Sequence, residues 1–230
     1  MTAVVTRRTK GVNEWNVCLL DSRRNIALAC ALSALAGFVD AIGYLQLGGL
    51  FVSFMSGNST RMGVAIAHAH WQTAAEALGL VALFVIGAAA GSLIVLGHGA
   101  YRQPFVLLAE ALLLAVAALA YSFGQPSLAV AAIVLAMGLE NAVFQIHGGA
   151  GLGLTYVTGA LVKVGQLMAK ALTGGSRWAW APNLLLWAAL VAGSVLGALA
   201  YAWINLAAIW FAAAAALTLS GIVAATNRRH

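Results

Sequence analysis

Eight long apolar runs, joined by short connections, make up most of this chain of 230 residues. A helix needs about 20 apolar residues to cross a hydrocarbon core of about 30 Å. Because the runs are continuous and do not alternate as the strands of a membrane β-barrel do, they predict an all-α, polytopic transmembrane helix bundle. Their approximate limits are 25–46, 50–70, 74–97, 104–122, 126–147, 152–172, 181–203 and 205–226.

Charged residues are scarce, and the basic ones lie mainly at the ends of the apolar runs. Hydrophobic residues make up 63% of the chain and charged residues 8%, whereas soluble domains carry about 25% charged residues. A net charge of +6 could indicate nucleic-acid binding in a soluble protein. Here the positive-inside rule explains it, so we expect the lipid bilayer as a partner and no nucleic acid.

The two ends of the chain are polar. Residues 1–24 lack the short apolar core and small-residue cleavage site of a signal peptide. We therefore expect a basic cytoplasmic tail at 1–24, a single transmembrane domain at 25–226, and a second cytoplasmic tail at 227–230.

The transmembrane domain contains an internal repeat of a little over 100 residues. Residues 36–63 read AGFVDAIGYLQLGGLFVSFMSGNSTRMG, and residues 137–165 read MGLENAVFQIHGGAGLGLTYVTGALVKVG. The repeat predicts two sequence-related halves of four segments, at about 25–122 and 126–226. The aligned positions include Gly37 and Gly138, Asp40 and Asn141, Ser56 and Thr158, Arg61 and Lys163, and Gly87-x3-Gly91 and Gly193-x3-Gly197.

Two membrane arrangements fit the basic residues. If all eight runs span, both termini lie inside with Lys170 and Arg177, but Arg102 lies outside. If the second and sixth runs enter and return, six runs span, all these residues lie inside, and the halves are inverted repeats. The first arrangement avoids irregular backbone at membrane depth, which needs shielding by protein or a water-filled cavity. We therefore expect eight helices, with a broken or re-entrant second and sixth helix as the alternative.

Each half places one acid and one base inside its apolar runs. Such residues usually face a bundle interior or a water-filled pathway, and buried charges are tolerated when they are paired. We therefore expect Asp40 near Arg61, and Glu140 near Lys163 or, across the repeat interface, near Arg61. The candidate substrate-binding residues are Asp40, Tyr44, Ser56, Asn58, Arg61, Glu140, Asn141, Thr158 and Lys163.

No motif of a catalytic, metal or cofactor site accompanies these polar residues. The sequence lacks a Walker loop, a nucleophile elbow, an HExxH helix and a dinucleotide fingerprint. His68 and His70 are spaced as metal ligands could be, but no carboxylate or Cys accompanies them. We therefore expect no enzyme, no cofactor and no bound metal.

The two motifs of the repeat resemble those of a known family. GFVDAIGYLQLGGLFVSFMSGNSTRMG, followed about 100 residues later by MGLENAVFQ and TYVTGALVKVG, resembles the YoaK-like (DUF1275) family of bacterial integral membrane proteins. The resemblance covers the chain from about residue 25 and implies a multi-pass protein of the bacterial inner membrane. It supplies no substrate, reaction or site residues, because the family is functionally uncharacterised.

The duplicated polar segments favour a transport function. Broken helices at a repeat interface form the sites of many transporters, so we expect a small transporter or permease for an unidentified solute or ion. The alternative is a non-transporting assembly or partner-binding protein in which the buried charges are structural ion pairs. A membrane enzyme has the least support, because no nucleophile–base pair is visible. The sequence leaves the oligomeric state open, and an oligomer is compatible with it.

Overall fold

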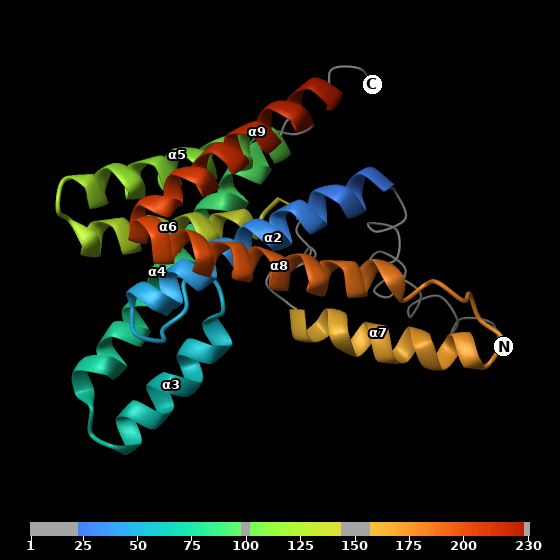
Figure 1. Ribbon diagram of the computed structural model, residues 1–230, viewed down its shortest axis with the longest axis horizontal. Coiled ribbons are helices and arrows are strands. Elements are labelled where there is room, and N and C mark those ends of the chain that lie inside the picture. The colour runs from blue at the N-terminus through green and yellow to red at the C-terminus, as the bar shows by residue number, and fades with distance from the viewer. Residues whose placement is uncertain (1–22, 98–101, 144–156, 228–230) are drawn as a thin grey trace, which may run out of the picture.

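The computed structural model describes residues 23–97, 102–143 and 157–227, and every regular element within them is a helix (Figure 1). The expected all-α architecture is therefore confirmed for these residues, while the expected tails lie almost entirely outside them. The elements are α2 (Arg23–Gln46), α3 (Met55–Ala67), α4 (Trp71–Gly97), α5 (Arg102–Ser122), α6 (Pro126–Glu140), α7 (Val157–Leu172), α8 (Ala181–Ile204), the short 3-10 helix η2 (Asn205–Ala208) and α9 (Ile209–Asn227).

Four helical stretches are long and apolar enough to cross a membrane, as expected for a multi-pass protein. The last stretch joins α8, η2 and α9 over 47 residues. With that stretch counted as one, the described residues contain seven helical segments, so the expected eight spanning helices are not confirmed. The shorter helices α3, α6 and α7 have 13, 15 and 16 residues, fewer than the about 20 that a full crossing needs. The four long stretches are Arg24–Gln46, Trp71–Gly97, Arg102–Ser122 and Ala181–Asn227.

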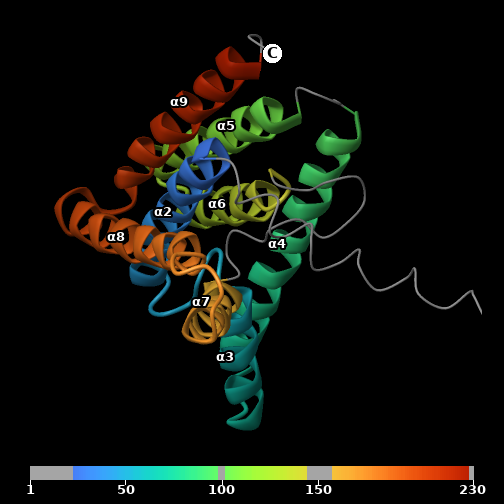
Figure 2. The same cartoon turned by 90° about the vertical axis from the view of Figure 1, so that its right-hand side faces the viewer.

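Four helices, α8, α2, α6 and α4, form a row, and two further helices lie on each side of this row. Figure 2 shows α2 and α6 in the middle of the row, with α8 beside α2 on one flank and α4 beside α6 on the other. The pair of α5 and α9 covers one side of this row, and α3 and α7 lie on the opposite side. The apolar core lies mainly where α5, α6 and α9 meet α2 and α4.

Glycines let the two helices of the α2–α8 pair, and likewise those of the α4–α6 pair, approach each other closely. The contacts are of the same kind in both pairs. In the α2–α8 pair, a methyl group on Gly37, Gly193 or Gly197 would overlap a backbone carbonyl of the partner helix. Small residues of this kind let helix backbones pack directly against each other in membranes. The six glycine-to-carbonyl contacts are Gly37 with Leu190, Gly193 with Ala34, and Gly197 with Phe38 in the first pair, and Gly138 with Phe84, Gly87 with Leu135, and Gly91 with Leu139 in the α4–α6 pair.

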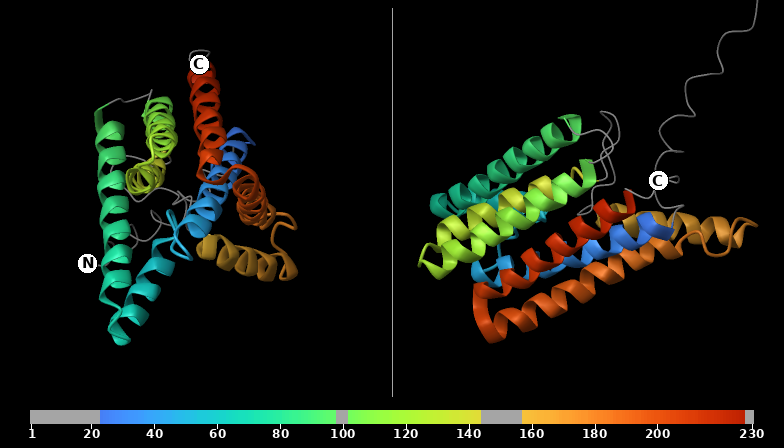
Figure 3. Two further views of the ribbon diagram at one scale, coloured as in Figure 1. Left: turned by 60° about the vertical axis from the view of Figure 1, so that its left-hand side comes forward. Right: turned by 90° about the horizontal axis from the view of Figure 1, so that it is seen from above.

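Hydrogen bonds between distant helices show which helix ends lie together. Arg24 at the start of α2 donates to Asn227 at the end of α9, at 2.5 Å. Ser220 of α9 donates to the carbonyl of Pro104 at the start of α5, at 2.9 Å. The starts of α2 and α5 and the end of α9 therefore share one end of the molecule, as Figure 3 shows from above. We call this the first end, and the end with the α5–α6 turn the second end.

The short helices α3 and α7 run to opposite ends of the molecule (Figure 1). The successive glycine contacts make α4 parallel to α6 and α8 parallel to α2, so α4 starts at the second end and α8 at the first. A short turn joins α3 to the start of α4, and another joins α7 to the start of α8. The helix α3 therefore ends at the second end, where α2 also ends, and α7 ends at the first.

Candidate functional site

The chain between α2 and α3 turns back into the helix bundle. Gly48 and Gly49 have φ angles of 61° and 106°, in the left-handed region that glycine adopts without strain, and they form the turn after α2. Residues 50–54 then run back alongside α2 without helical structure. We call residues 47–54 the return segment. The expected full-length helix at 50–70 is wrong, because its first five residues are not helical and α3 ends at Ala67.

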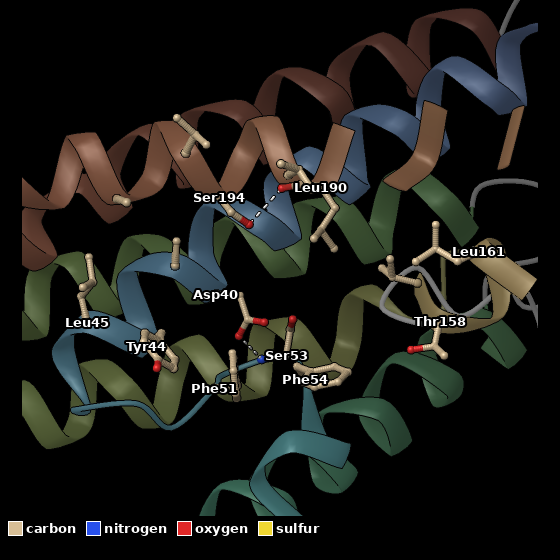
Figure 4. A pocket seen from close by; sticks show the side chains of 15 residues that line it. Asp40, Tyr44, Leu45, Phe51, Ser53, Phe54, Thr158, Leu161, Leu190 and Ser194 are labelled. Atoms are coloured by element: carbon tan, nitrogen blue, oxygen red, sulfur yellow. Dashed lines mark hydrogen bonds between the residues drawn. The ribbon is translucent and has the colours of Figure 1, made fainter. Parts of the chain in front are cut away.

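Asp40 holds the return segment against α2. One carboxylate oxygen, Oδ1, accepts a hydrogen bond from the backbone N–H group of Val52 at 2.8 Å. The same oxygen accepts another from the N–H group of Ser53 at 2.9 Å (Figure 4). Asp40 lies six residues before Gln46, the last residue of α2, which is about 9 Å along the helix axis at 1.5 Å per residue. The carboxylate therefore satisfies irregular backbone at Val52 and Ser53, which are both buried, and an unpaired N–H group there would be costly.

Asn58 holds the same segment from the side of α3. Its side chain is fully buried; its Oδ1 accepts from the N–H of Phe51 at 2.8 Å, and its Nδ2 donates to the carbonyl of Phe51 at 2.7 Å. A single amide thus satisfies both peptide groups of one residue. Asp40 and Asn58 together provide partners for three consecutive N–H groups of the return segment, so both residues have a structural role.

Arg61 does not pair with Asp40, and the expected ion pair is wrong. The guanidinium of Arg61 is exposed and donates to the carbonyl of Gly49 and, at 3.5 Å, to the carbonyl of Gly48. These carbonyls follow the C-terminus of α2, where free carbonyl groups and the helix dipole attract a positive charge. The partner of Arg61 is therefore the backbone of the turn and not the carboxylate that the sequence predicts.

A cavity of about 720 Å³ opens beside Asp40 (Figure 4). Its walls come from α2, the end of the return segment, the first residues of α7, and α8. Val157, the first residue of α7, and Phe54, the residue before α3, both line it. The N-terminal ends of the two short helices therefore meet the same cavity. Its polar lining residues are Asp40, Tyr44, Ser53, Thr158 and Ser194.

The cavity is mainly apolar and carries one charged residue, Asp40, among its lining side chains. Three aromatic rings follow one another on the side of the return segment: Tyr44 and Phe51 lie 5.0 Å apart between ring centroids, and Phe51 and Phe54 lie 5.3 Å apart. The hydroxyl of Ser194 donates to the carbonyl of Leu190 in its own helix, at 3.0 Å. This arrangement suits a small, mostly apolar solute with a positive or hydrogen-bond-donating group that faces Asp40 and the rings.

Of the nine candidate residues, only Asp40, Tyr44 and Thr158 line the cavity. Asn58 and Arg61 support the return segment, and Ser56 is exposed on α3. Lys163 lies half-buried on α7, and Asn141 follows the end of α6, with its Nδ2 donating to the carbonyl of Met137 at 2.9 Å.

Glu140 lies elsewhere, and its expected pairing with Lys163 or Arg61 is wrong. It is the last residue of α6 and is fully buried. Its neighbour is Glu110 of α5, which interacts with it electrostatically. Glu110 lies on α5 and Glu140 on α6, and neither residue lines the cavity, so the two form a separate feature of the fold.

Sequence reasoning missed Ser53, Ser194 and Glu110. Ser53 lies in a stretch expected to be helical. Ser194 lies in the apolar run 181–203, where the small-residue pattern predicts helix packing and no binding site. Glu110 could have been found, because α5 and α6 are joined by a tight turn at Gly124. Glu110 lies 14 residues before Gly124 and Glu140 lies 16 residues after it, so an antiparallel hairpin brings them to the same level.

Comparisons with known proteins agree with a membrane protein. The family model described as "Protein of unknown function (DUF1275)" matches residues 28–222. The chain is also 37% identical over 204 residues to the UPF0700 transmembrane protein RA0705 of Rhizobium meliloti (strain 1021), and the alignment covers 89% of this chain and 88% of that protein. No solved structure matches the chain. A relative named as a transmembrane protein and the four long apolar stretches support the same class.

Proposed function

The chain belongs to the family described as protein of unknown function (DUF1275), and from this premise and the site geometry we propose that it is a small permease. Its solute site is the cavity beside Asp40. The main support is that α3 and α7 both begin at this cavity and run to opposite ends of the molecule. Transporters commonly bind solutes where such broken helices meet near the middle of the bilayer.

The two halves of the chain form an inverted repeat in this proposal. The matching glycine contacts of the α2–α8 and α4–α6 pairs support it, because each pair joins one helix from each half. The opposite directions of α3 and α7 support it as well. A pseudo-two-fold axis in the membrane plane would relate the halves, and the rocking of one half against the other would open the cavity to alternate sides.

The first end of the molecule is the cytoplasmic end in this proposal, and the membrane is the bacterial inner membrane. Arg24 and Arg102 lie at the starts of α2 and α5, Lys170 lies in the last turn of α7, and Arg177 precedes α8. All four belong to the first end, which is the distribution that the positive-inside rule describes for cytoplasmic loops. Both termini would then be cytoplasmic.

A second function is supported by the hydrogen bonds of Asp40 and Asn58. Both side chains satisfy the backbone of the return segment, as expected if the polar motif only stabilises the fold. The chain would then be a non-transporting assembly or partner-binding protein. This alternative predicts that Asp40 variants lose stability without any specific effect on a solute.

Flux into liposomes separates the two functions. The full-length protein is reconstituted and tested with small amines, quaternary ammonium compounds, neutral apolar amides and carboxylic acids. We expect saturable uptake of amines or quaternary ammonium compounds, with at least an about tenfold loss in Asp40→Asn, which keeps an acceptor oxygen for Val52 and Ser53. Ala198→Phe, which fills the cavity from α8, should lower uptake as well.

Glu76→Gln provides the matched control for the loss of a negative charge. Glu76 is exposed on α4, away from the cavity, and accepts a hydrogen bond from Gln72 at 3.1 Å. This variant should transport as the wild type does. Uptake no greater than in empty liposomes for every solute class would contradict the permease and favour the alternative.

A further inference from the structure

The α5–α6 hairpin buries two glutamates, one on each helix. Glu110 of α5 and Glu140 of α6 are both fully buried, and they interact electrostatically. Leu107 and Leu114, on the same face of α5 as Glu110, are fully buried too, as is Met137 on α6. The two carboxyl groups therefore lie in an apolar interface between helices.

The carboxyl groups have no partner among the described residues. All four oxygens, Oε1 and Oε2 of each glutamate, are inaccessible to solvent and accept or donate no hydrogen bond within that part of the chain. Nearly all buried polar atoms in folded proteins have such a partner. Four unsatisfied oxygens on two interacting side chains therefore indicate that a proton or another bound species occupies this interface.

No charged side chain of the described residues neutralises the pair. Arg102 lies eight residues before Glu110 on α5, and Glu76 lies near the start of α4, at the second end. On α2, Asp40 is bound to the return segment, and Arg24 donates to Asn227 of α9. The described part of α9 carries no ionisable side chain. On α5 and α6, the only ionisable side chain besides Arg102 and the two glutamates is that of Tyr121, three turns from Glu110.

Packing alone does not require a carboxylic acid at this position. Since Asp40 aligns with Asn141 in the internal repeat, the residue aligned with Glu140 is Val39, which is fully buried as well. An apolar side chain thus fills the matching position of α2. An ionised carboxylate without a partner is strongly unfavourable in such an interior, and two neighbouring carboxylates repel each other.

We propose that Glu110 and Glu140 form a proton-binding site, in which one carboxyl group donates its proton to the other across the α5–α6 interface. The bound proton removes one negative charge and provides one hydrogen bond between the two carboxyl groups. The site takes up one proton from water and releases it again when the interface opens, with no change in any covalent bond between heavy atoms. It does not depend on the solute cavity or on the proposed permease function.

Infrared titration of the full-length protein in detergent tests the proposal directly. A protonated carboxyl group has a C=O stretching band that an ionised carboxylate lacks. With only six acidic residues in the chain, the band can be assigned by substitution. We expect the wild type to retain a carboxylic acid band at neutral pH and to lose it at alkaline pH. Glu110→Gln and Glu140→Gln should each remove or shift this band, whereas Glu76→Gln and Asp40→Asn should leave it in place.

Thermal unfolding provides a second measurement. At alkaline pH the loss of the shared proton leaves two negative charges in an apolar interface, so the midpoint of the wild type should fall as the pH rises. The double variant E110Q/E140Q should lose most of this dependence, while Glu76→Gln should keep it. A midpoint that is independent of pH in the wild type would contradict the proposal.

Two further results would overturn the assignment. If the wild type shows no carboxylic acid band at neutral pH, both groups are ionised and no shared proton exists. If sodium chloride raises the midpoint at constant pH and choline chloride does not, and Glu140→Gln abolishes that rise, the occupant is a metal cation instead. The wild-type titration alone decides the first point, even where a variant fails to fold.

Discussion

The carboxylate of Asp40 accepts a hydrogen bond from the backbone N–H of Ser53 at 2.9 Å, and so joins a transmembrane helix to a segment that folds back beside it. The same oxygen also accepts from Val52. A non-helical backbone below the membrane surface needs such partners. This relationship explains how a chain with few polar residues can hold the non-helical return segment inside its helix bundle, next to a cavity.

Asp40→Ala should destabilise the protein much more than Asp40→Asn. Alanine leaves the N–H groups of Val52 and Ser53 unsatisfied, at a cost of about 1–3 kcal/mol each, whereas the amide oxygen of asparagine can still accept from both. The thermal midpoint of each purified variant in detergent measures the difference. Equal midpoints for the two variants would show that these hydrogen bonds contribute little to stability.

Asn58→Asp should also be destabilising, because the carboxylate keeps the acceptor for the N–H of Phe51 but loses the donor to its carbonyl. Asn58 is fully buried, so we expect a loss of about 1–3 kcal/mol. Ser59→Ala is the control: Ser59 is exposed and donates to the carbonyl of Met55 in its own helix, so its loss should be within about 0.5 kcal/mol. A larger effect for Ser59→Ala than for Asn58→Asp would argue against this role of Asn58.

Gly193→Leu should prevent the close packing of α2 and α8, because any side chain at this position overlaps the backbone of Ala34. The expected result is severe destabilisation or failure to accumulate in membranes. Gly221→Ala on α9 is the matched control, since no neighbouring atom lies within 4 Å of an added methyl group. It should be neutral or stabilising by about 0.5–1 kcal/mol. Expression level and thermal midpoint measure both, and a normal midpoint for Gly193→Leu would contradict the described packing.

Thr158→Cys should react with a water-soluble thiol reagent, because Thr158 lines the open cavity and is exposed. The test uses a variant in which Cys18 and Cys30 are replaced by serine. Ala136→Cys on α6 should remain unlabelled, since Ala136 is fully buried between helices. Labelling of Thr158→Cys that an added solute slows would support a binding cavity. Equal labelling of both positions would mean that the interior is not closed as described.

Pairing charges by sequence alone failed for a definite reason. Arg61 and Asp40 carry opposite charges in the same half of the chain, but each binds backbone groups that only a non-helical segment exposes. A continuous helix satisfies its own N–H and carbonyl groups. If the segment is predicted to be such a helix, only other side chains remain as partners for Asp40 and Arg61. Glu140 illustrates the same limit, because its neighbour Glu110 comes from an adjacent helix whose polar residue has no counterpart in the repeat motif.

The sequence by itself determined the membrane class, the all-helical architecture and the approximate position of most helices. These follow from local properties: the length of an apolar run, the spacing of glycines, and breakers such as Gly48-Gly49. It also indicated Asp40, Tyr44 and Thr158, since polar residues are rare in apolar runs. The tertiary structure decided that α3, α6 and α7 are short, that Asp40 binds the return segment, and that Glu110 meets Glu140. These features depend on which backbone groups and helix faces meet across long sequence separations, and no local pattern specifies that.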